Sequence, residues 1–147
     1  MANEKVQQGL NGLLADSTVL YEKLHAFHWM LVGPQFFQMH AKFEDLYDQF
    51  AKVTDDIAER ILTVGGKPVA TLRGVLELAQ IKEYEGQTSA KDMIAVLVKD
   101  YEHLLRQSGK VIEAAEEASD RGTANLLDGI RDELEKTLWM FNAWRVG

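Results

Sequence analysis

The chain has 147 residues, of which 46% are hydrophobic and 27% are charged, and its net charge is −7. This composition suits a single domain over 1–147 with one sizeable core, and it excludes a disordered chain. No apolar run approaches the ~18 residues of a membrane span and no leader segment is visible, so we expect a cytoplasmic protein without a membrane partner. Cysteine is absent, so we expect neither disulfides nor thiolate metal sites.

Apolar residues recur every three or four positions along most of the chain, which predicts long helices. The first helix spans about 7–31 and ends at Gly33-Pro34. The second runs to about Val64, where Gly65-Gly66 is a typical stop signal. Both helices are therefore expected to exceed twenty residues.

A short helix is expected over 71–79, inside the connection that follows. Ser89, with Asp92 three residues later, resembles a capping box that opens a third long helix, which ends near Ala118. Thr123 is positioned to cap a fourth long helix. Four long helices with one long crossover between the second and the third predict an all-α, ferritin-like four-helix bundle with a short extra helix in the crossover.

The second long helix carries the polar residues that bear most on function. At 100° per residue, with His40 as the origin, Glu44 lies at about 40°, Asp55 at about 60° and Glu59 at about 100°. Alanines share this face, and His28 lies near the end of the preceding helix. Each residue alone is typical of a solvated charge or a packed histidine. Carboxylates on a face open to close packing are costly unless a cation binds them, so the shared stripe favours a metal site.

The rise along the helix decides how such a site is built. Glu44 and Asp55 are separated by about 16 Å along the axis, so one ion cannot contact both. If two copies of the helix pack antiparallel about a twofold axis, His40 and Glu44 of one chain face Asp55 and Glu59 of the other, which gives two identical sites. Two histidines with two or three carboxylates suit iron(II), and also zinc or manganese, and leave positions open for an oxidant.

Two motifs of the sequence are specific by length and spacing together: His28-Trp29-Met30-Leu31-Val32-Gly33 followed by Met39-His40 and Glu44, and Asp55-Asp56-Ile57-Ala58-Glu59-Arg60 with Gly65 and Pro68. Leu138-Trp139-Met140-Phe141 near the C-terminus is a further characteristic run. At these residues the chain resembles the Dps family, the starvation-induced DNA-protection mini-ferritins. The resemblance extends over nearly the whole chain. It departs from the family pattern at Met39, where Leu or Val is usual, and at Glu44, where Asp is common, and neither departure removes a ligand.

The resemblance implies a hollow shell of twelve subunits with a ferroxidase centre between twofold-related chains. The implied activity is oxidation of iron(II) by hydrogen peroxide or, more slowly, by dioxygen, with storage of iron(III) mineral in the shell and protection of the cell and its DNA from oxidative damage. The implied iron ligands, which agree with the helical geometry, come from two chains: His28, His40 and Glu44 of one, and Asp55 and Glu59 of the other.

Two parts of this interpretation have alternatives. Trp29 adjoins a ligand and could donate an electron to quench a reactive intermediate, or it could be a packed aromatic residue at a helix end. The Lys/Arg-rich tail by which some family members bind DNA is missing here. Twelve chains of −7 each carry −84, so we expect DNA binding to be weak or absent at physiological salt.

Two other functions remain as alternatives. An ordinary intrasubunit di-iron ferritin or oxidase needs Glu-x-x-His pairs, and Glu22 with His25 has that spacing, while Asp100 with His103 is an Asp version. We expect both pairs at the surface or in local contacts on a helix face. The non-enzymatic alternative is a DNA-compacting or purely structural cage, in which the carboxylates of the second helix only hold subunits together.

Overall fold

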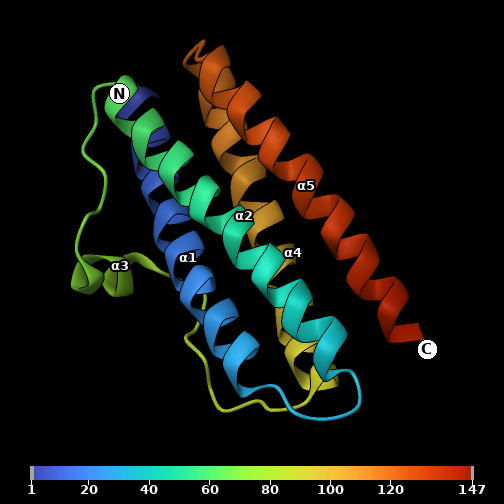
Figure 1. The fold of residues 1–147 in the computed structure, drawn as a ribbon. Helices are drawn as coiled ribbons and strands as arrows, with labels where there is room; N and C mark the ends of the chain where they lie inside the picture. The colour runs from blue at the N-terminus through green and yellow to red at the C-terminus, as the bar shows by residue number, and fades with distance from the viewer. Residues whose placement is uncertain (1, 147) are drawn as a thin grey trace.

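The computed structural model describes residues 2–146, and these fold entirely into helices and connections (Figure 1). The prediction of four long helices with a short one in the crossover is confirmed. In chain order the helices are α1 (Ala2–Met30), α2 (Phe36–Thr63), α3 (Leu72–Leu78), α4 (Ala90–Glu117) and α5 (Arg121–Val146).

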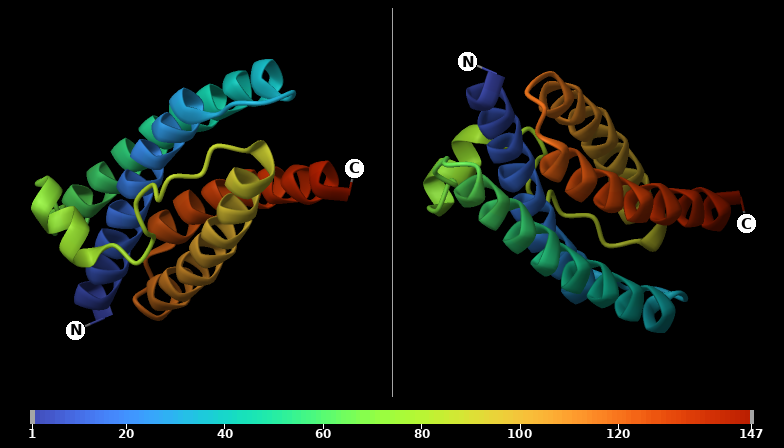
Figure 2. Two further views of the ribbon diagram at one scale, coloured as in Figure 1. Left: turned by 90° about the horizontal axis from the view of Figure 1, so that it is seen from below. Right: turned by 90° about the horizontal axis from the view of Figure 1, so that it is seen from above.

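The long helices form two antiparallel pairs, α1 with α2 and α4 with α5, and the pairs meet where α1 packs on α4. Figure 2 shows the two pairs crossing at an angle, with the connection from α2 to α4 passing along the bundle. We call this connection, residues 64–89, the crossover. Its helix α3 stands at one side of the bundle beside α1.

The core forms where the apolar stripes of the four long helices meet. The apolar residues of the first predicted helix that recur at three- and four-residue spacing are all buried: Leu10, Leu13, Leu14, Leu20, Leu24, Phe27 and Leu31. They are buried because α1 lies between α2, α4 and α3 and so has neighbours on most of its surface. Several core side chains are completely enclosed: Leu10, Leu20, Leu24, Phe27, Phe43, Ile61 and Met93.

Two of the predicted helix starts are correct and two differ from the structure. The side-chain oxygens of Thr71 and Ser89 cap α3 and α4, as expected for these residue types. The prediction that Thr123 caps the fourth long helix is wrong: the helix starts at Arg121, and Asp120 Oδ1 accepts the Thr123 backbone N–H at 3.1 Å. The first helix begins at Ala2 and not near residue 7, because Val6 extends the buried stripe by another turn.

The turn between α1 and α2 brings the end of one helix beside the start of the next. Gly33 has φ +114°, a left-handed conformation that costs glycine little, and Pro34 lies two residues before Phe36, the first residue of α2. The backbone N–H of Val32 donates to the carbonyl of Thr88 at 2.9 Å. This turn is therefore tied to the far end of the crossover.

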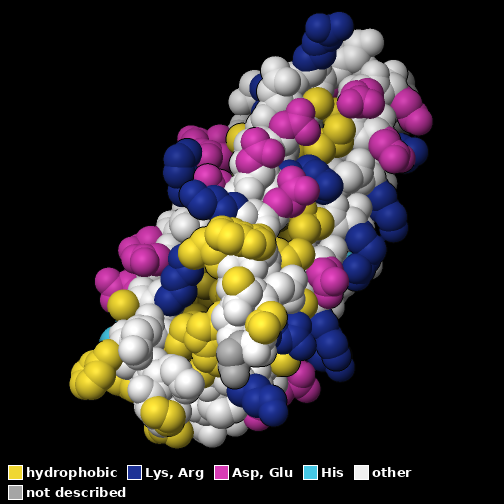
Figure 3. All heavy atoms as spheres, turned by 90° about the vertical axis from the view of Figure 1, so that its right-hand side faces the viewer, with side chains coloured by type: hydrophobic (Ala, Val, Ile, Leu, Met, Phe, Trp, Pro, Cys, Tyr) yellow, Lys and Arg dark blue, Asp and Glu magenta, His cyan; other side chains and the backbone are white. Residues whose placement is uncertain are grey.

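Large apolar side chains remain exposed at several places on the surface. Phe37, Leu72 and Trp139 are each more than 60% exposed. On the face shown in Figure 3, apolar side chains gather in the middle and lower part while acidic side chains cluster above them. Surfaces of this kind mark sites of protein association. None of the helices is long and apolar enough, over the described residues, to cross a membrane.

Candidate metal centre

Two histidines from different helices meet at the α1–α2 turn. His28 lies in the last turn of α1 and His40 in the second turn of α2, and their rings stack with centroids 3.6 Å apart and planes 12° apart. His28 Nδ1 lies 2.7 Å from the carbonyl oxygen of His40, and His40 Nδ1 lies 2.8 Å from the carbonyl oxygen of His28. The pair is thus held by two reciprocal hydrogen bonds.

These hydrogen bonds determine which nitrogen of each ring can bind a metal. A carbonyl oxygen only accepts, so Nδ1 must carry the proton in both rings. The lone pair of each neutral ring is then on Nε2, and a backbone carbonyl bound to the other nitrogen is the usual support of a metal-ligating histidine. His28 Nε2 lies 3.8 Å from Glu44 Oε1. His28 Nε2 and the Glu44 carboxylate therefore lie close together, with the His40 ring stacked on His28.

Glu44 lies one turn after His40 on α2 and is about half exposed. The remaining predicted ligands lie further along the same helix. Asp55 and Glu59 are exposed, and together with Asp56 they offer carboxylate oxygens that all lie within 4.8 Å of one another. Asp56 is already paired with Lys52 at 2.6 Å. Asp55 and Glu59 have no ion-pair partner in the described part of the chain, so they are available to a cation.

A single chain does not bring all five predicted ligands together. The structure joins His28, His40 and Glu44 at one end of α2, and it places Asp55 and Glu59 about three turns away on the same helix. Each group has too few protein ligands to hold two ions alone. The predicted ligands therefore fall into two separate groups, one at the α1–α2 turn and one further along α2.

Aromatic side chains surround the histidine pair. Trp29 is 63% exposed, and its closest aromatic neighbour is His25, at a centroid distance of 5.5 Å. The Tyr47 ring stacks on His25 at 3.7 Å and contacts the edge of His28 at 5.4 Å. Burial, reinforced by the negative charge of Glu44 and Asp48, raises the pKa of Tyr47, which therefore stays protonated at neutral pH.

Tyr47 is not among the site residues that the sequence predicts, although its ring contacts His28. The spacing does contain the signal, because Tyr47 lies three residues after Glu44 and seven after His40, on neighbouring faces of one helix. Phe36 also stacks on the His40 ring, at 4.8 Å. The aromatic residues thus shield one side of the histidine pair and leave the Glu44 side open.

The two Glu-x-x-His-like pairs of the alternative interpretation lie in different surroundings. Glu22 is exposed, and His25 Nδ1 bonds to the Tyr21 carbonyl at 2.9 Å, which is the local contact we expected. The expectation is wrong for Asp100 and His103, which point into the bundle.

Both of these interior side chains already have partners of opposite charge or complementary polarity. Asp100 Oδ2 lies 2.7 Å from the ammonium of Lys23, and His103 Nε2 lies 2.8 Å from Asp16 Oδ2. Burial raises the pKa of Asp100, and the buried Lys23 acts in the opposite direction. Both interior carboxylates therefore already have side-chain partners, and among the described residues they form no set of ligands for an intrasubunit metal site.

Comparison with known proteins agrees with this architecture. The family model described as a ferritin-like domain matches residues 7–146. The chain is 47% identical to DNA protection during starvation protein 2 of Bacillus anthracis over 97% of each chain. The crystal structure of a Dps protein from Bacillus brevis superposes with a TM-score of 0.95 at 43% identity, covering 97% of this chain and 96% of that one.

A second solved structure connects the fold to its chemistry. It is the Dps protein of Vibrio cholerae O1, described as a member of a broad superfamily of ferritin-like diiron-carboxylate proteins. It superposes with a TM-score of 0.95 at 38% identity, covering 97% of this chain and 90% of that one. The ferritin-like class predicted for the bundle is confirmed by these matches.

Proposed function

The chain belongs to the Dps family of ferritin-like proteins, and on that basis we propose that it is a ferroxidase that oxidises iron(II) at sites shared between two subunits. Membership of this diiron-carboxylate family indicates iron storage and protection from oxidative damage as the general function. The specific proposal concerns the oxidant, the location of the site and the assembly.

One observation supports the proposal: Glu44 and Asp55, from the two groups of predicted ligands, lie about 16 Å apart along α2. Glu44 is about half exposed and Asp55 is exposed, while His28 beside Glu44 is buried. Antiparallel packing of two α2 helices about a twofold axis would join His28, His40 and Glu44 of one subunit to the second subunit's copies of Asp55 and Glu59. An isologous contact of this kind makes two complete sites at once.

The surface beside α3 supports self-association. A groove of about 570 Å³ lies between α1 and α3, lined mainly by apolar side chains that include Val19, Leu72 and Leu76. Leu72 and Leu76 are 78% and 50% exposed. Burying such side chains against a second copy contributes roughly 25 cal/mol for each Å² removed from water. The shell of twelve subunits remains a prediction, with a mass of about 199 kDa from twelve chains of 16.6 kDa.

The proposed chemistry uses iron(II) as the substrate. Two iron(II) ions each give one electron to hydrogen peroxide, whose O–O bond breaks, and two protons complete two molecules of water, leaving two iron(III) ions. Dioxygen is the slower oxidant in this proposal. The histidine Nε2 atoms must be unprotonated and the carboxylates ionised to bind, so activity falls at acid pH as the ligands take up protons. The iron(III) then passes to a mineral inside the shell.

Trp29 keeps its proposed role as an electron donor that quenches a reactive intermediate. Its contact with His25, which stacks on Tyr47 beside His28, supports a short path to the ligands. DNA is protected in this proposal by removal of iron(II) and peroxide together, with weak or absent binding to DNA.

The direct test measures iron(II) oxidation by the purified protein, with peroxide and with air as oxidants. We expect faster oxidation with peroxide, and a loss of at least tenfold in His28→Ala, because a ligand is removed. His25→Ala is the matched control, since His25 also lies at the end of α1 but is not a proposed ligand. An intrasubunit di-iron enzyme would show the opposite pattern, and a structural cage would show no oxidation by the wild-type protein.

A further inference from the structure

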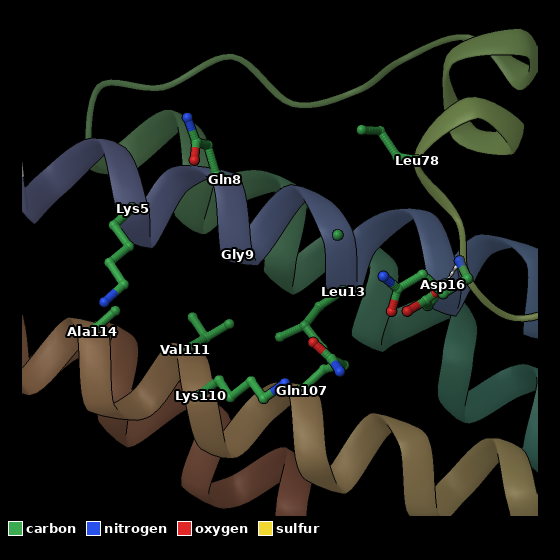
Figure 4. Close-up of a pocket in the computed structure, with 12 residues that line it drawn as sticks. Lys5, Gln8, Gly9, Leu13, Asp16, Leu78, Gln107, Lys110, Val111 and Ala114 are labelled. Carbon is green, nitrogen blue, oxygen red and sulfur yellow. Dashed lines mark hydrogen bonds between the residues drawn. The ribbon is translucent and has the colours of Figure 1, made fainter.

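The last part of the crossover, residues 79–89, runs from the end of α3 to the start of α4, and we call it the return segment. Asp16 of α1 fixes its start: Asp16 Oδ1 accepts the backbone N–H groups of Gln80 at 2.7 Å and Ile81 at 3.0 Å (Figure 4). Asp16 is 3% exposed, and its other oxygen, Oδ2, accepts from His103 Nε2 at 2.8 Å. A buried carboxylate is costly unless it is hydrogen-bonded, and three donors meet that need here. The return segment therefore starts from a fixed position on α1.

The far end of the return segment reaches the turn between α1 and α2. The carbonyl of Thr88 accepts the backbone N–H of Val32 at 2.9 Å. Within the described part of the chain, this hydrogen bond alone ties residues 31–35 to a segment other than α1 and α2. Leu31 is buried, but the side chains at 32–35 are exposed, so packing holds the turn only at its first residue. The position of the turn therefore depends on the return segment.

Tyr84 holds the middle of the return segment against the end of α1. Its ring meets the ring of Phe27 edge-on, with centroids 5.9 Å apart and planes at 76°. Phe27 in turn packs on Phe43 of α2 at a centroid distance of 5.7 Å, and both phenylalanines are fully buried. Aromatic pairs at such distances attract one another and favour particular ring orientations. Tyr84 is therefore the outer member of a row of three rings that joins the crossover, α1 and α2.

The Tyr84 hydroxyl also sets the shape of the return segment. It donates to the Gln87 carbonyl at 2.7 Å, across a turn in which Gly86 has φ +100°, a conformation that glycine adopts at little cost. Gln87 directly precedes Thr88, whose carbonyl accepts the Val32 N–H. The hydroxyl thus holds the Thr88 carbonyl in the position where it meets the α1–α2 turn.

Two rings of this row are sequence neighbours of proposed iron ligands. Phe27 precedes His28, and Phe43 precedes Glu44. His28 and His40 are bonded to each other's backbone carbonyls, so a shift of the backbone at the end of α1 moves both rings. A displacement of about 1 Å at a reacting group can lower a rate about 10²-fold. Contacts that fix the end of α1 therefore matter for the chemistry of the site.

We propose that Tyr84 is a positioning residue for iron oxidation, which keeps His28 in place through two contacts. Its ring holds the end of α1 by packing on Phe27, and its hydroxyl holds the α1–α2 turn through the return segment. This inference rests on the proposed function, in which His28 is an iron ligand. Tyr84 is not itself a ligand, so its removal changes the geometry of the site and leaves the set of ligands intact.

The experiment compares Tyr84→Phe, which removes only the hydroxyl, with Tyr84→Leu, which also removes the ring. Cobalt(II) is the probe of the site, because imidazole and carboxylate ligands bind it and its visible absorption spectrum changes with their geometry. Hydrogen exchange at the Val32 amide reports whether the turn is released. The rate of iron(II) oxidation by peroxide is measured at saturating iron(II), and sedimentation velocity selects samples of the same assembly state.

We expect faster exchange at the Val32 amide in both variants. In Tyr84→Leu the cobalt(II) spectrum should change, and the rate at saturating iron(II) should fall about tenfold or more, because a displaced ligand slows the reaction itself. In Tyr84→Phe the ring still packs on Phe27 and one hydrogen bond is lost, so the rate should fall only about threefold. Partial rescue by the conservative variant is the mark of a positioning role.

Two variants serve as controls. Tyr101→Phe is the match for loss of a hydroxyl: Tyr101 is buried in α4, and its hydroxyl has no hydrogen-bond partner among the described residues, so this variant should behave as the wild type. Leu127→Ala is the control for a general loss of stability, since Leu127 is fully buried in α5 and its truncation leaves a core cavity. The helix α5 begins at the end of the bundle opposite the α1–α2 turn (Figure 1), so Leu127→Ala should leave the cobalt(II) spectrum unchanged.

The proposal is overturned if the Tyr84 variants release the Val32 amide yet keep the cobalt(II) spectrum and the oxidation rate of the wild type. It is also overturned if Leu127→Ala changes the spectrum as much as Tyr84→Leu does. If Tyr84→Leu does not assemble, Tyr84→Phe decides by the same criteria. A wild-type protein that binds no cobalt(II) and oxidises no iron(II) would instead contradict the proposed function, so the two failures are distinguishable.

Discussion

Acidic side chains occupy two contrasting regions of this molecule, the centre of the bundle and the exposed face of α2. In the centre, Asp100 is paired with Lys23 at 2.7 Å and Asp16 accepts from His103 at 2.8 Å. On α2, Asp55 and Glu59 lie exposed without a cationic partner among the described residues. The same residue type therefore serves the fold in one region and remains available for a metal ion in the other.

The difference follows from the cost of burial. A carboxylate inside the bundle must be neutralised by the chain itself, because water cannot reach it. A carboxylate on the surface keeps its hydration until a cation or a second subunit arrives. Changes in the first region should therefore alter stability, and changes in the second should alter iron chemistry.

The largest expected effect comes from Lys23→Met. It leaves the Asp100 carboxylate buried without its cation, and we expect the free energy of unfolding to fall by about 3–5 kcal/mol. The double variant Lys23→Met with Asp100→Leu should recover most of this loss, because no unpaired charge remains. Urea denaturation followed by circular dichroism measures both variants, and Lys99→Met, at an exposed position of α4, is the control. A small loss in Lys23→Met would show that the pair does not hold the interior.

A change on the exposed face of α2 should lower iron oxidation and leave stability nearly unchanged. Glu59→Gln removes a proposed ligand, so the rate of iron(II) oxidation should fall at least tenfold, which corresponds to about 1.4 kcal/mol in the activation free energy. The free energy of unfolding should stay within about 0.5 kcal/mol of wild type. Stopped-flow absorbance of iron(III) formation gives the rate. Glu102→Gln, at an exposed position of α4, should leave it unchanged. Equal rates for Glu59→Gln and the wild type would remove Glu59 from the site.

A smaller effect is expected at the α4–α5 turn, where Asp120 binds both Arg60, at 2.7 Å, and the first turn of α5. Partial burial acts to raise the pKa of Asp120, but the hydrogen bonds from Thr123 and the Arg60 guanidinium outweigh it and hold the pKa below its usual range. Asp120→Ala should therefore cost about 1 kcal/mol, mainly through the lost helix cap.

The pH dependence of that loss has a definite sign. A lowered folded-state pKa gives stability that is present above the unfolded value, about 3.9, and is lost as the pH falls through the folded value. The difference between wild type and Asp120→Ala should be constant above about pH 5 and shrink below about pH 4. Asp120→Asn, which keeps a capping oxygen, should lose less. A difference that grows in acid would contradict the assignment.

The smallest expected effect is on DNA. The chain carries −7, and the exposed bases Lys91, Lys99 and Arg106 of α4 stand among acidic residues. A gel-shift series without divalent cations should show no stable complex at about 0.15 M salt, since neutralising phosphates supplies most non-specific affinity. Complexes that persist at that salt concentration would reveal a basic surface created by assembly.

Much of this architecture could be predicted from the sequence because helices are encoded locally. The spacing of apolar residues and the Gly33, Ser89 and Thr71 signals place most helix ends within a few residues. The stripe of His40, Glu44, Asp55 and Glu59 is likewise a property of one helix. These features need no knowledge of which helices become neighbours.

The rest depends on contacts between segments far apart in the sequence. The ion pair of Lys23 with Asp100 joins α1 to α4. The ion pair of Arg60 with Asp120 joins α2 to the turn between α4 and α5. A signal for the interior charges does exist: Asp16 and Lys23 occupy the same stripe as Leu13, Leu20 and Phe27, at alternating spacings of three and four. Charges at such positions indicate buried pairs, although the partner cannot be read from spacing.

Complementation between two inactive variants tests the shared iron site most directly. His40→Ala and Asp55→Ala damage different groups of ligands, so each variant alone should lack activity. In subunits mixed under conditions that allow reassembly, a mixed twofold contact contains one intact site and one doubly damaged site. We predict that iron(II) oxidation by peroxide returns in proportion to the mixed contacts, and that it stays absent when His40→Ala is mixed with Glu44→Ala. Mixed assemblies, proven by mass spectrometry, that show no recovery would contradict a site built from two chains.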